Sequence, residues 1–505
     1  DDLNEEKPRN KELYKDSDLN RAFQIDFKDH VNYMSFLKNR LSKVSKSPEN
    51  YYNYLPVVQS SGYGKTRSIC ELAKSHPLIY ICFRDKGSTG YPPATPKSDI
   101  MLKEIKKATN IAIAEEMAKI WLKSMIFVFY EMKLESSKLL TNTELENNFW
   151  KKVHSTKEIL KSNWDAQKID NKITKKIAIF FDESSALLDN QDNDNKSFRA
   201  IRRALYFFSE YAYGILTDTN SSVANLAPSK NKDSSAREYD RNIHKPFIYI
   251  VTQDCLSDID QIPHDEDISA HDIIQFGRPL WASNWVASKH SDNQFKFRDV
   301  INLAKAKLLG STSSWNIGKS NSQWKRTVTL ALIACTAALY VSPASSIAPE
   351  LVRAHMATLI AIDKDYENYI ITYPSEPILS EASLELMSEG NIGKKLLLLN
   401  AWHHLVLSKK SINSKVTFSS RFPVIDFLQE LLGYAFPKEK FSHFNDFMLG
   451  FTHFIPVTYV PVKEDLISIY KRRGAVLCKR NQKGIDLIIP IMCNKNIKIG
   501  TILIQ

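Results

Sequence analysis

The pattern of apolar and polar positions divides the first half of the chain into short apolar runs separated by stretches of helical periodicity. A continuous apolar run is typical of a strand buried on both faces of a parallel sheet. Helical stretches such as 101–132 and 198–209 alternate with these runs, which predicts an α/β sheet with helices on both faces. The five predicted strands lie in 55–58, 78–83, 176–183, 213–219 and 247–252.

The pattern changes further along the chain and predicts four regions. Each boundary falls where the apolar spacing or the density of polar residues shifts. The regions are 1–50, an N-terminal helical extension with its helical pattern at 19–44; 51–285, the α/β domain; 286–400, a helical lid or winged-helix-like region; and 401–505, a small α/β module.

Composition indicates a soluble globular protein. A chain of 505 residues with 43% hydrophobic content can bury a sizeable core in about two to four domains. The six cysteines show no paired metal spacing and lie mostly in apolar runs, as reduced core cysteines do. The most apolar segment, 327–341, is only 15 residues long, so we expect a buried helix and no membrane span. We therefore expect an intracellular protein.

The strongest chemical signal is the segment 59–66, which ends in Gly64-Lys65-Thr66. It lies between an apolar run and a helix-forming run, which is the layout of a phosphate-binding loop. In such a loop the backbone N–H groups and the helix N-terminus face the phosphates, the lysine reaches them, and the threonine hydroxyl binds Mg²⁺. The residues expected to contact a nucleotide are Ser61, Gly62, Tyr63, Gly64, Lys65, Thr66 and Arg67.

One position departs from the usual loop pattern. Gln59 stands where the first glycine of the pattern would be. A glycine-rich turn that caps a helix and binds no ligand therefore remains an alternative.

The run 176–183 supplies the second half of the predicted site. It is apolar and ends in Asp182 and Glu183, at the edge of the sheet where open α/β folds bind ligands. Asp182 is expected to hold Mg²⁺ with Thr66, and Glu183 is expected to polarise an attacking water. The alternative is a strand that ends in an ordinary acidic turn.

Two further places could contribute to this site. Thr217, Asp218 and Thr219 end a predicted strand and could sense the terminal phosphate, or they could only cap the strand. Arg278, on a turn bounded by Gly277 and Pro279, could reach the phosphates and stabilise developing charge; an ordinary surface arginine is the alternative.

The C-terminal region predicts a helix at 464–471 and strands at 475–481, 485–492 and 500–505. A helix and three strands, with Asp486 opening the second strand and Gln505 ending the third, form the layout of PD-(D/E)xK nucleases. In that layout the two side chains bind Mg²⁺ at the scissile phosphate. The lysine expected two residues after Gln505 would fall beyond the sequence, so we expect a truncated module. An ordinary α/β subdomain is the alternative.

Basic charge is concentrated in the same region. Residues 391–505 hold 17 Lys and Arg against 7 Asp and Glu, a net charge of +10 in a chain of +11. Such an excess suits an anionic polymer such as DNA, although a solvated basic face is the alternative. The basic residues that crowd together are Lys471, Arg472, Arg473, Lys479, Arg480 and Lys483.

With these motifs placed, the sequence resembles the Crinkler-type effector-like proteins of fungi and oomycetes. It is most similar to fungal members in which a P-loop NTPase precedes a restriction-endonuclease-like domain. The resemblance implies an NTPase coupled to a nuclease that acts on DNA, with a host nucleus as one place of action. The family's Leu-Phe-Leu-Ala-Lys translocation segment is absent from this sequence. The segments that carry the resemblance are 59–67, 180–184, 216–220, 276–281, 373–377 and 481–486.

These patterns lead to one main expectation and two rivals. The main expectation is a Mg²⁺-dependent hydrolase of ATP or GTP that switches a nucleic-acid-binding module. The first rival binds nucleotide without hydrolysing it and works as an interaction protein. The second places the activity in the nuclease-like module, with Asp486 as its catalytic residue.

Overall fold

The computed structural model describes most of the residues of the chain. The described ranges are 16–29, 31–46, 53–84, 91–163, 175–188, 195–218, 244–257, 270–288, 297–310, 326–363, 368–389, 397–432, 437–479, 485–493 and 498–504.

A four-stranded parallel sheet organises the first half of the molecule. Its spatial order is β1-β4-β3-β2, so β4 lies between the two strands that carry the predicted motifs. The strands are β1 (Tyr54–Val57), β2 (Leu78–Cys82), β3 (Ile177–Asp182) and β4 (Ala212–Thr217). All of their residues are buried, which agrees with the continuous apolar runs.

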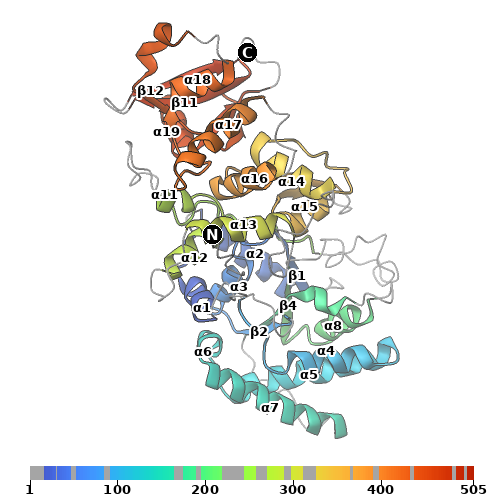
Figure 1. The fold of residues 1–505 in the computed structure, drawn as a ribbon. Coiled ribbons are helices and arrows are strands. Elements are labelled where there is room, and N and C mark those ends of the chain that lie inside the picture. The colour runs from blue at the N-terminus through green and yellow to red at the C-terminus, as the bar shows by residue number, and fades with distance from the viewer. Residues whose placement is uncertain are drawn as a thin grey trace, which may run out of the picture.

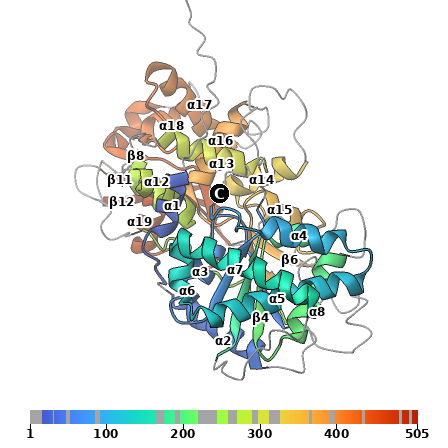
Figure 2. The same cartoon turned by 90° about the horizontal axis from the view of Figure 1, so that it is seen from below.

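Helices cover both faces of this sheet, as expected. One face packs on a layer whose longest members are α5 and α7, which lie at the bottom of Figure 1 and in front in Figure 2. The other face packs on α2 and α3. The helices of the first layer are α4 (Ser98–Lys107), α5 (Ile111–Glu131), α7 (Thr143–Ser162) and α8 (Lys196–Phe207), with the short α6 (Ser136–Thr141) beside α7.

The N-terminal extension forms two helices instead of one, α1 (Asp16–Gln24) and α2 (Tyr33–Lys46). The apolar side of α2, including Leu37 and Leu41, is buried against α3 (Lys65–Leu72) and the sheet. The extension therefore shares the core of the α/β domain.

The fifth predicted strand, 247–252, is not a strand. Its single bridge pairs Phe247 with Val57 of β1. Beyond this bridge a tight turn brings the N–H of Ile250 to the carbonyl of Ile248, so the ladder stops after one residue.

The middle of the chain is mainly helical, as predicted, with one antiparallel hairpin. The hairpin of β5 and β6 follows α15 and precedes α16. The elements are α11 (Ala270–Ile274), α12 (Pro279–Ser288), α13 (Phe297–Leu308), α14 (Arg326–Ala337), α15 (Ala348–Ala354), β5 (Thr358–Ile362), β6 (Tyr369–Thr372) and α16 (Pro377–Glu389).

The C-terminal module contains the predicted helix and three strands within a larger mixed sheet. Three further strands of two to four residues were missed. The predicted elements are α19 (Lys463–Lys471), β10 (Gly474–Leu477), β11 (Leu487–Cys493) and β12 (Lys498–Ile504), and the others are β7 (Phe422–Pro423), β8 (Phe447–Leu449), β9 (His453–Pro456), α17 (Leu397–Ile412), α18 (Val424–Leu432) and a 3₁₀ helix (Lys438–Phe444).

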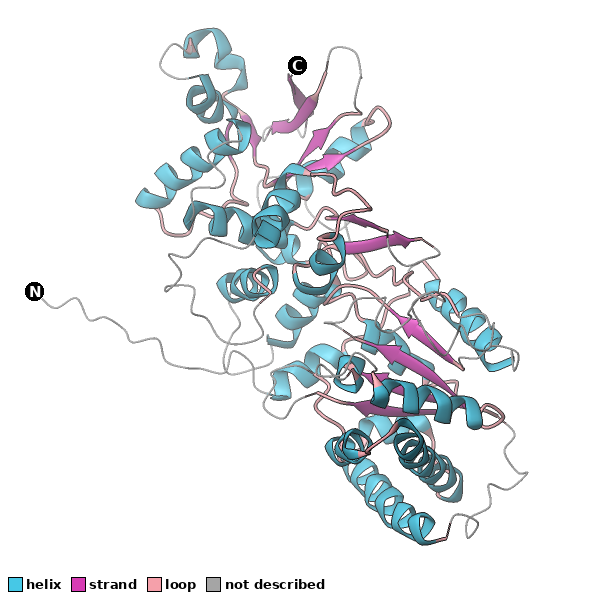
Figure 3. Ribbon diagram, turned by 90° about the vertical axis from the view of Figure 1, so that its right-hand side faces the viewer, coloured by secondary structure: helices cyan, strands magenta, loops and turns pink. Residues whose placement is uncertain are grey.

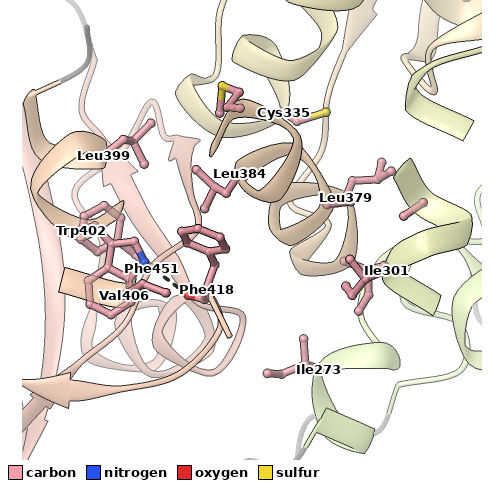
Figure 4. Packing of buried hydrophobic residues seen from close by; sticks show 14 of the residues in the cluster. Ile273, Ile301, Cys335, Leu379, Leu384, Leu399, Trp402, Val406, Phe418 and Phe451 are labelled. Atoms are coloured by element: carbon pink, nitrogen blue, oxygen red, sulfur yellow. Dashed lines mark hydrogen bonds between the residues drawn. The ribbon is translucent and has the colours of Figure 1, made fainter. Parts of the chain in front are cut away.

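The three sheets lie one above another along the long dimension of the molecule (Figure 3). One hydrophobic cluster runs from Ile273 through α16 to Trp402 and Phe451, so the helical region and the C-terminal module share a core (Figure 4). Among the described residues, no helix is long and apolar enough to cross a membrane. All six cysteines are buried and unpaired, as their apolar setting predicts.

Candidate functional site

The turn between β1 and α3, residues 59–64, is here called the glycine loop. Its two glycines have left-handed backbone angles, with φ of 84° at Gly62 and 75° at Gly64. A Cβ atom on Gly62 would also lie 2.9 Å from atoms of Arg278 and Leu280. Both glycines are therefore required by the turn that they form.

Lys65 begins α3 and folds its ammonium back into the glycine loop. Its Nζ donates to the carbonyls of Gln59 at 2.7 Å and Ser60 at 3.2 Å, and the side chain is buried. Burial lowers the pKa of Lys65 to about 8, although the nearby carboxylates of Asp182 and Glu183 oppose the shift. The ammonium is thus held in a confined, partly desolvated place.

Asp182 brings the two predicted half-sites together. Its Oδ2 accepts hydrogen bonds from the hydroxyls of Thr66 at 2.9 Å and Tyr80 at 3.0 Å. Its Oδ1 accepts from the hydroxyl of Thr217 and, at 3.1 Å, from the backbone N–H of Glu183. Four donors on one carboxylate fix its orientation beside the first turn of α3.

Glu183 follows directly, in a left-handed conformation with φ of 54°. Its Oε1 is paired with the Nη2 of Arg84 at 2.9 Å. Burial raises the pKa of Glu183, the charge on Asp182 raises it further, and Arg84 opposes them. A half-buried carboxyl with a raised pKa is suited to accepting a proton.

Arg84 was not predicted, although one sequence signal could have found it. It lies two residues after the end of β2, and β2 is the neighbour of β3 in the sheet. Polar residues that follow neighbouring parallel strands meet at one edge.

The three residues predicted at the end of β4 differ in what they contact. Thr217 contacts Asp182, so its hydroxyl orients a carboxylate of the site instead of capping the strand. Asp218 is buried beside it and acts electrostatically on Lys65. Thr219 lies outside the described residues.

Arg278 is not a surface residue; its side chain is buried, with 1% of the residue's surface exposed. Its Nη1 donates to the carbonyl of Ser61 at 2.6 Å, so it does reach the glycine loop. Its Nε and Nη2 form a two-point ion pair with the buried Glu376 at 2.8 and 2.7 Å, and Nη2 also donates to the carbonyl of Met356 at 2.8 Å. Arg278 thus ties the glycine loop to α16.

The side chain of Gln59 also connects the glycine loop to the hairpin, through hydrogen bonds. Its Nε2 donates to the carbonyls of Ile248 at 3.2 Å and Leu359 at 3.0 Å, and its Oε1 accepts from the N–H of Leu359 at 2.9 Å. The side-chain amide therefore pairs with β5 as a strand backbone would.

Tyr63 and Arg67, both predicted to contact a nucleotide, are engaged elsewhere. The Tyr63 hydroxyl bonds Thr358 at 2.6 Å, on the hairpin. Arg67 donates to the carbonyl of Ile25 at 3.2 Å and its guanidinium lies over the ring of Phe23, both in the N-terminal extension.

The predicted nuclease site has one described member, Asp486. Its side chain is exposed, and its backbone N–H donates to the carbonyl of Ile504 at 2.8 Å, at the end of β12. Gln505 lies outside the described residues. In the part of the chain that the structure describes, no three His, Cys, Asp or Glu residues are grouped as a metal site.

The central part of the predicted basic surface is not a surface. Lys471 and Arg473 are buried, and Arg473 donates to the carbonyl of Ser419 at 2.8 Å. Arg472 is paired with Asp254 at 2.7 Å. These three residues therefore do not form the basic surface that was expected: Lys471 and Arg473 are buried, and Arg472 and Arg473 make internal contacts. Lys479 is exposed, and Arg480 and Lys483 lie outside the described residues.

Comparison with known proteins divides the chain into two matched parts. Residues 26–250 match a family described as a domain of unknown function (DUF8735). Residues 319–414 and 405–505 match a second one, also described as a domain of unknown function (DUF8736). No curated protein and no solved structure matches the chain.

Proposed function

We propose that this protein binds and hydrolyses a nucleoside triphosphate, ATP or GTP, at the glycine loop, and that it works as a Mg²⁺-dependent switch. The observation that carries the proposal is the contact between Thr66 and Asp182, 2.9 Å apart and from segments 116 residues distant in sequence. A buried lysine, a glycine loop, a helix N-terminus and a carboxylate converge there, and together they suit a phosphate chain.

The residues present fit a magnesium ion. Thr66 and Asp182 supply two oxygen ligands, and Mg²⁺ in phosphate sites usually takes one or two protein ligands with the rest from water and phosphate. When bound, the ion would neutralise charge on the phosphates. Tyr80 and Thr217 hold the carboxylate of Asp182 in place for this role.

The chain's own residues have separate tasks in hydrolysis. Lys65 and the loop amides would bind the phosphates, and the carbonyls that Lys65 now contacts would give way to phosphate oxygens. Glu183 would orient water and accept its proton, for which burial and its raised pKa prepare it.

The test is an assay of binding and turnover with each nucleoside triphosphate, with and without Mg²⁺ and DNA. Lys65→Ala should abolish binding. Glu183→Gln should bind normally and hydrolyse about 10²–10⁴ times more slowly. Wild-type turnover in Glu183→Gln would remove Glu183 as the base, and unchanged binding in Lys65→Ala would reject the site.

The second candidate function is nucleotide binding without hydrolysis. The ion pair between Arg84 and Glu183 favours it, because a carboxylate held by an arginine is a weaker base. Lys65-dependent binding with no turnover for any triphosphate would support this candidate. DNA as a partner of the C-terminal module is tested in the same assay, through a change in turnover when DNA is added.

A further inference from the structure

Helix α13 brings a cation from the C-terminal half of the chain to the candidate site. Its last turn carries Lys305 and Lys307. Lys305 is buried and its Nζ is paired with Glu385 at 2.8 Å. The ammonium of Lys307 has no hydrogen-bond or ion-pair partner among the described residues, and its side chain is only partly exposed.

The end of α13 is placed close to the glycine loop by a short chain of contacts. The carbonyl of Leu308 is 2.7 Å from Nδ1 of His355. The next residue, Met356, accepts a hydrogen bond from Arg278, which in turn donates to Ser61 of the glycine loop. Figure 1 shows α13 between the four-stranded sheet and the upper half of the molecule.

Lys307 interacts electrostatically with three charged groups at the site, Arg84, Glu183 and Arg278. Burial lowers the pKa of Lys307; Arg84 and Arg278 lower it further, while Glu183 opposes them. Arg84 is already paired with Glu183, and Arg278 with Glu376. No carboxylate binds the ammonium of Lys307 directly among the described residues, and its side chain is partly enclosed, so the ammonium is available to an incoming anion.

We infer that Lys307 contacts the terminal phosphate of the bound nucleotide and so reports to the C-terminal half whether a triphosphate or a diphosphate is present. The inference rests on the proposed function. Lys307 suits this task better than Arg278, because Arg278 would have to break its buried pair with Glu376 in order to move. A cation supplied from a second structural unit stabilises the charge of a transferring phosphate in known phosphoryl-transfer enzymes.

The experiment measures binding to the full chain by calorimetry in Mg²⁺, using a non-hydrolysable ATP analogue with ADP and a GTP analogue with GDP. Lys307→Met keeps the aliphatic stem and removes the charge. We expect it to weaken the triphosphate analogue about tenfold, the value of one charge-assisted hydrogen bond, and to leave the diphosphate unchanged. Lys307→Arg should retain the preference for triphosphate.

The control is Lys103→Met, an exposed lysine on α4. Thermal melting of each variant shows whether it is folded, and a purely structural role would move the melting temperature without changing the ratio of the two affinities. If the wild type binds in a Lys65-dependent manner and Lys307→Met shows the same ratio, the inference alone is overturned. If the wild type shows no Lys65-dependent binding, the proposed function is overturned and this inference with it.

Discussion

Gln59 departs from the usual pattern of a phosphate-binding loop, and its side chain makes contacts that explain the departure. The first position of a phosphate-binding loop is usually glycine, but the left-handed angles here fall at Gly62 and Gly64. Position 59 is therefore open to a side chain, and its amide makes three hydrogen bonds to Ile248 and Leu359. The departure from the pattern is explained by a contact with β5, 300 residues away in sequence.

Replacing Gln59 with glycine, which restores the usual pattern, should destabilise the protein. The change leaves the buried backbone groups of Leu359 without partners and adds freedom to the unfolded chain, at a cost of about 3 kcal/mol. Urea unfolding of the wild type and the variant measures this loss of stability. Ser61→Gly is the matched control in the same loop, and an equal loss in both variants would show that the amide contacts are unimportant.

Lys65 gives the proposed binding a pH dependence. Its pKa is lowered to about 8 by burial, against the opposing carboxylates, so the ammonium is present below pH 8 and is lost as the pH rises through that value. If the charged form binds phosphate, the Kd should rise about tenfold between pH 7 and pH 9.

Calorimetric titration at several pH values tests this prediction. Lys65→Arg is the control, because a guanidinium stays protonated throughout the range and should flatten the profile even where binding is weaker. A wild-type affinity that does not change up to pH 9 would contradict the assigned role of Lys65.

At the scale of elements, the turn before α12 and the start of α16 are joined by Arg278 and Glu376. Both side chains are fully buried, and Glu376 also accepts from the indole of Trp281 at 3.1 Å. Gly277, with φ of 97°, allows this approach, since a Cβ there would lie 2.7 Å from Glu376. The glycine loop is therefore held, through Arg278, by the turn before α12 and by the start of α16, which belong to the other half of the chain.

Glu376→Gln should destabilise the protein by roughly 3 kcal/mol, because it leaves the guanidinium of Arg278 buried without a counterion. The exposed Glu210→Gln is the control. In a double-mutant cycle, Glu376→Leu with Arg278→Met should cost less than the sum of the single changes. Additive costs measured by urea unfolding would show that the two residues do not act as a pair.

At the scale of the whole molecule, Arg472 connects the C-terminal module to the same contacts. Its guanidinium bonds Asp254 at 2.7 Å and the carbonyl of Ser375 at 2.6 Å. Asp254 in turn accepts from the N–H of Gly277 at 2.7 Å, next to Arg278. A continuous set of polar contacts thus runs from the glycine loop to the end of α19.

If a nucleotide changes the glycine loop, the change should reach β10 and β11 through Arg472. Hydrogen exchange of residues 474–477 and 487–493 should slow when a triphosphate analogue binds to the wild type. In Arg472→Ala, binding should persist and this protection should be lost, whereas Lys463→Ala, an exposed control, should behave as the wild type. Equal protection in both variants would exclude this route of coupling.

Much of the fold could be predicted from local sequence because burial leaves a local signature. The continuous apolar runs gave the four paired strands, and the helix and three strands near the C-terminus were found in the same way. Residues 247–252 show the limit of this signal. The run is apolar, but only Phe247 pairs with β1; the carbonyl of Ile248 then accepts from the N–H of Ile250 in a tight turn and from the amide of Gln59.

The glycine loop, Lys65, Thr66 and Asp182 could be located from the sequence, because a tight turn and the carboxyl end of a buried strand are both encoded within a few residues. Their surroundings could be read only from the folded chain. Arg84 pairs with Glu183, and Glu376 pairs with Arg278, across distant segments, and Lys471 and Arg473 are buried in spite of their charge. These outcomes depend on which segments meet in space, and the spacing of residues along the chain does not carry that information.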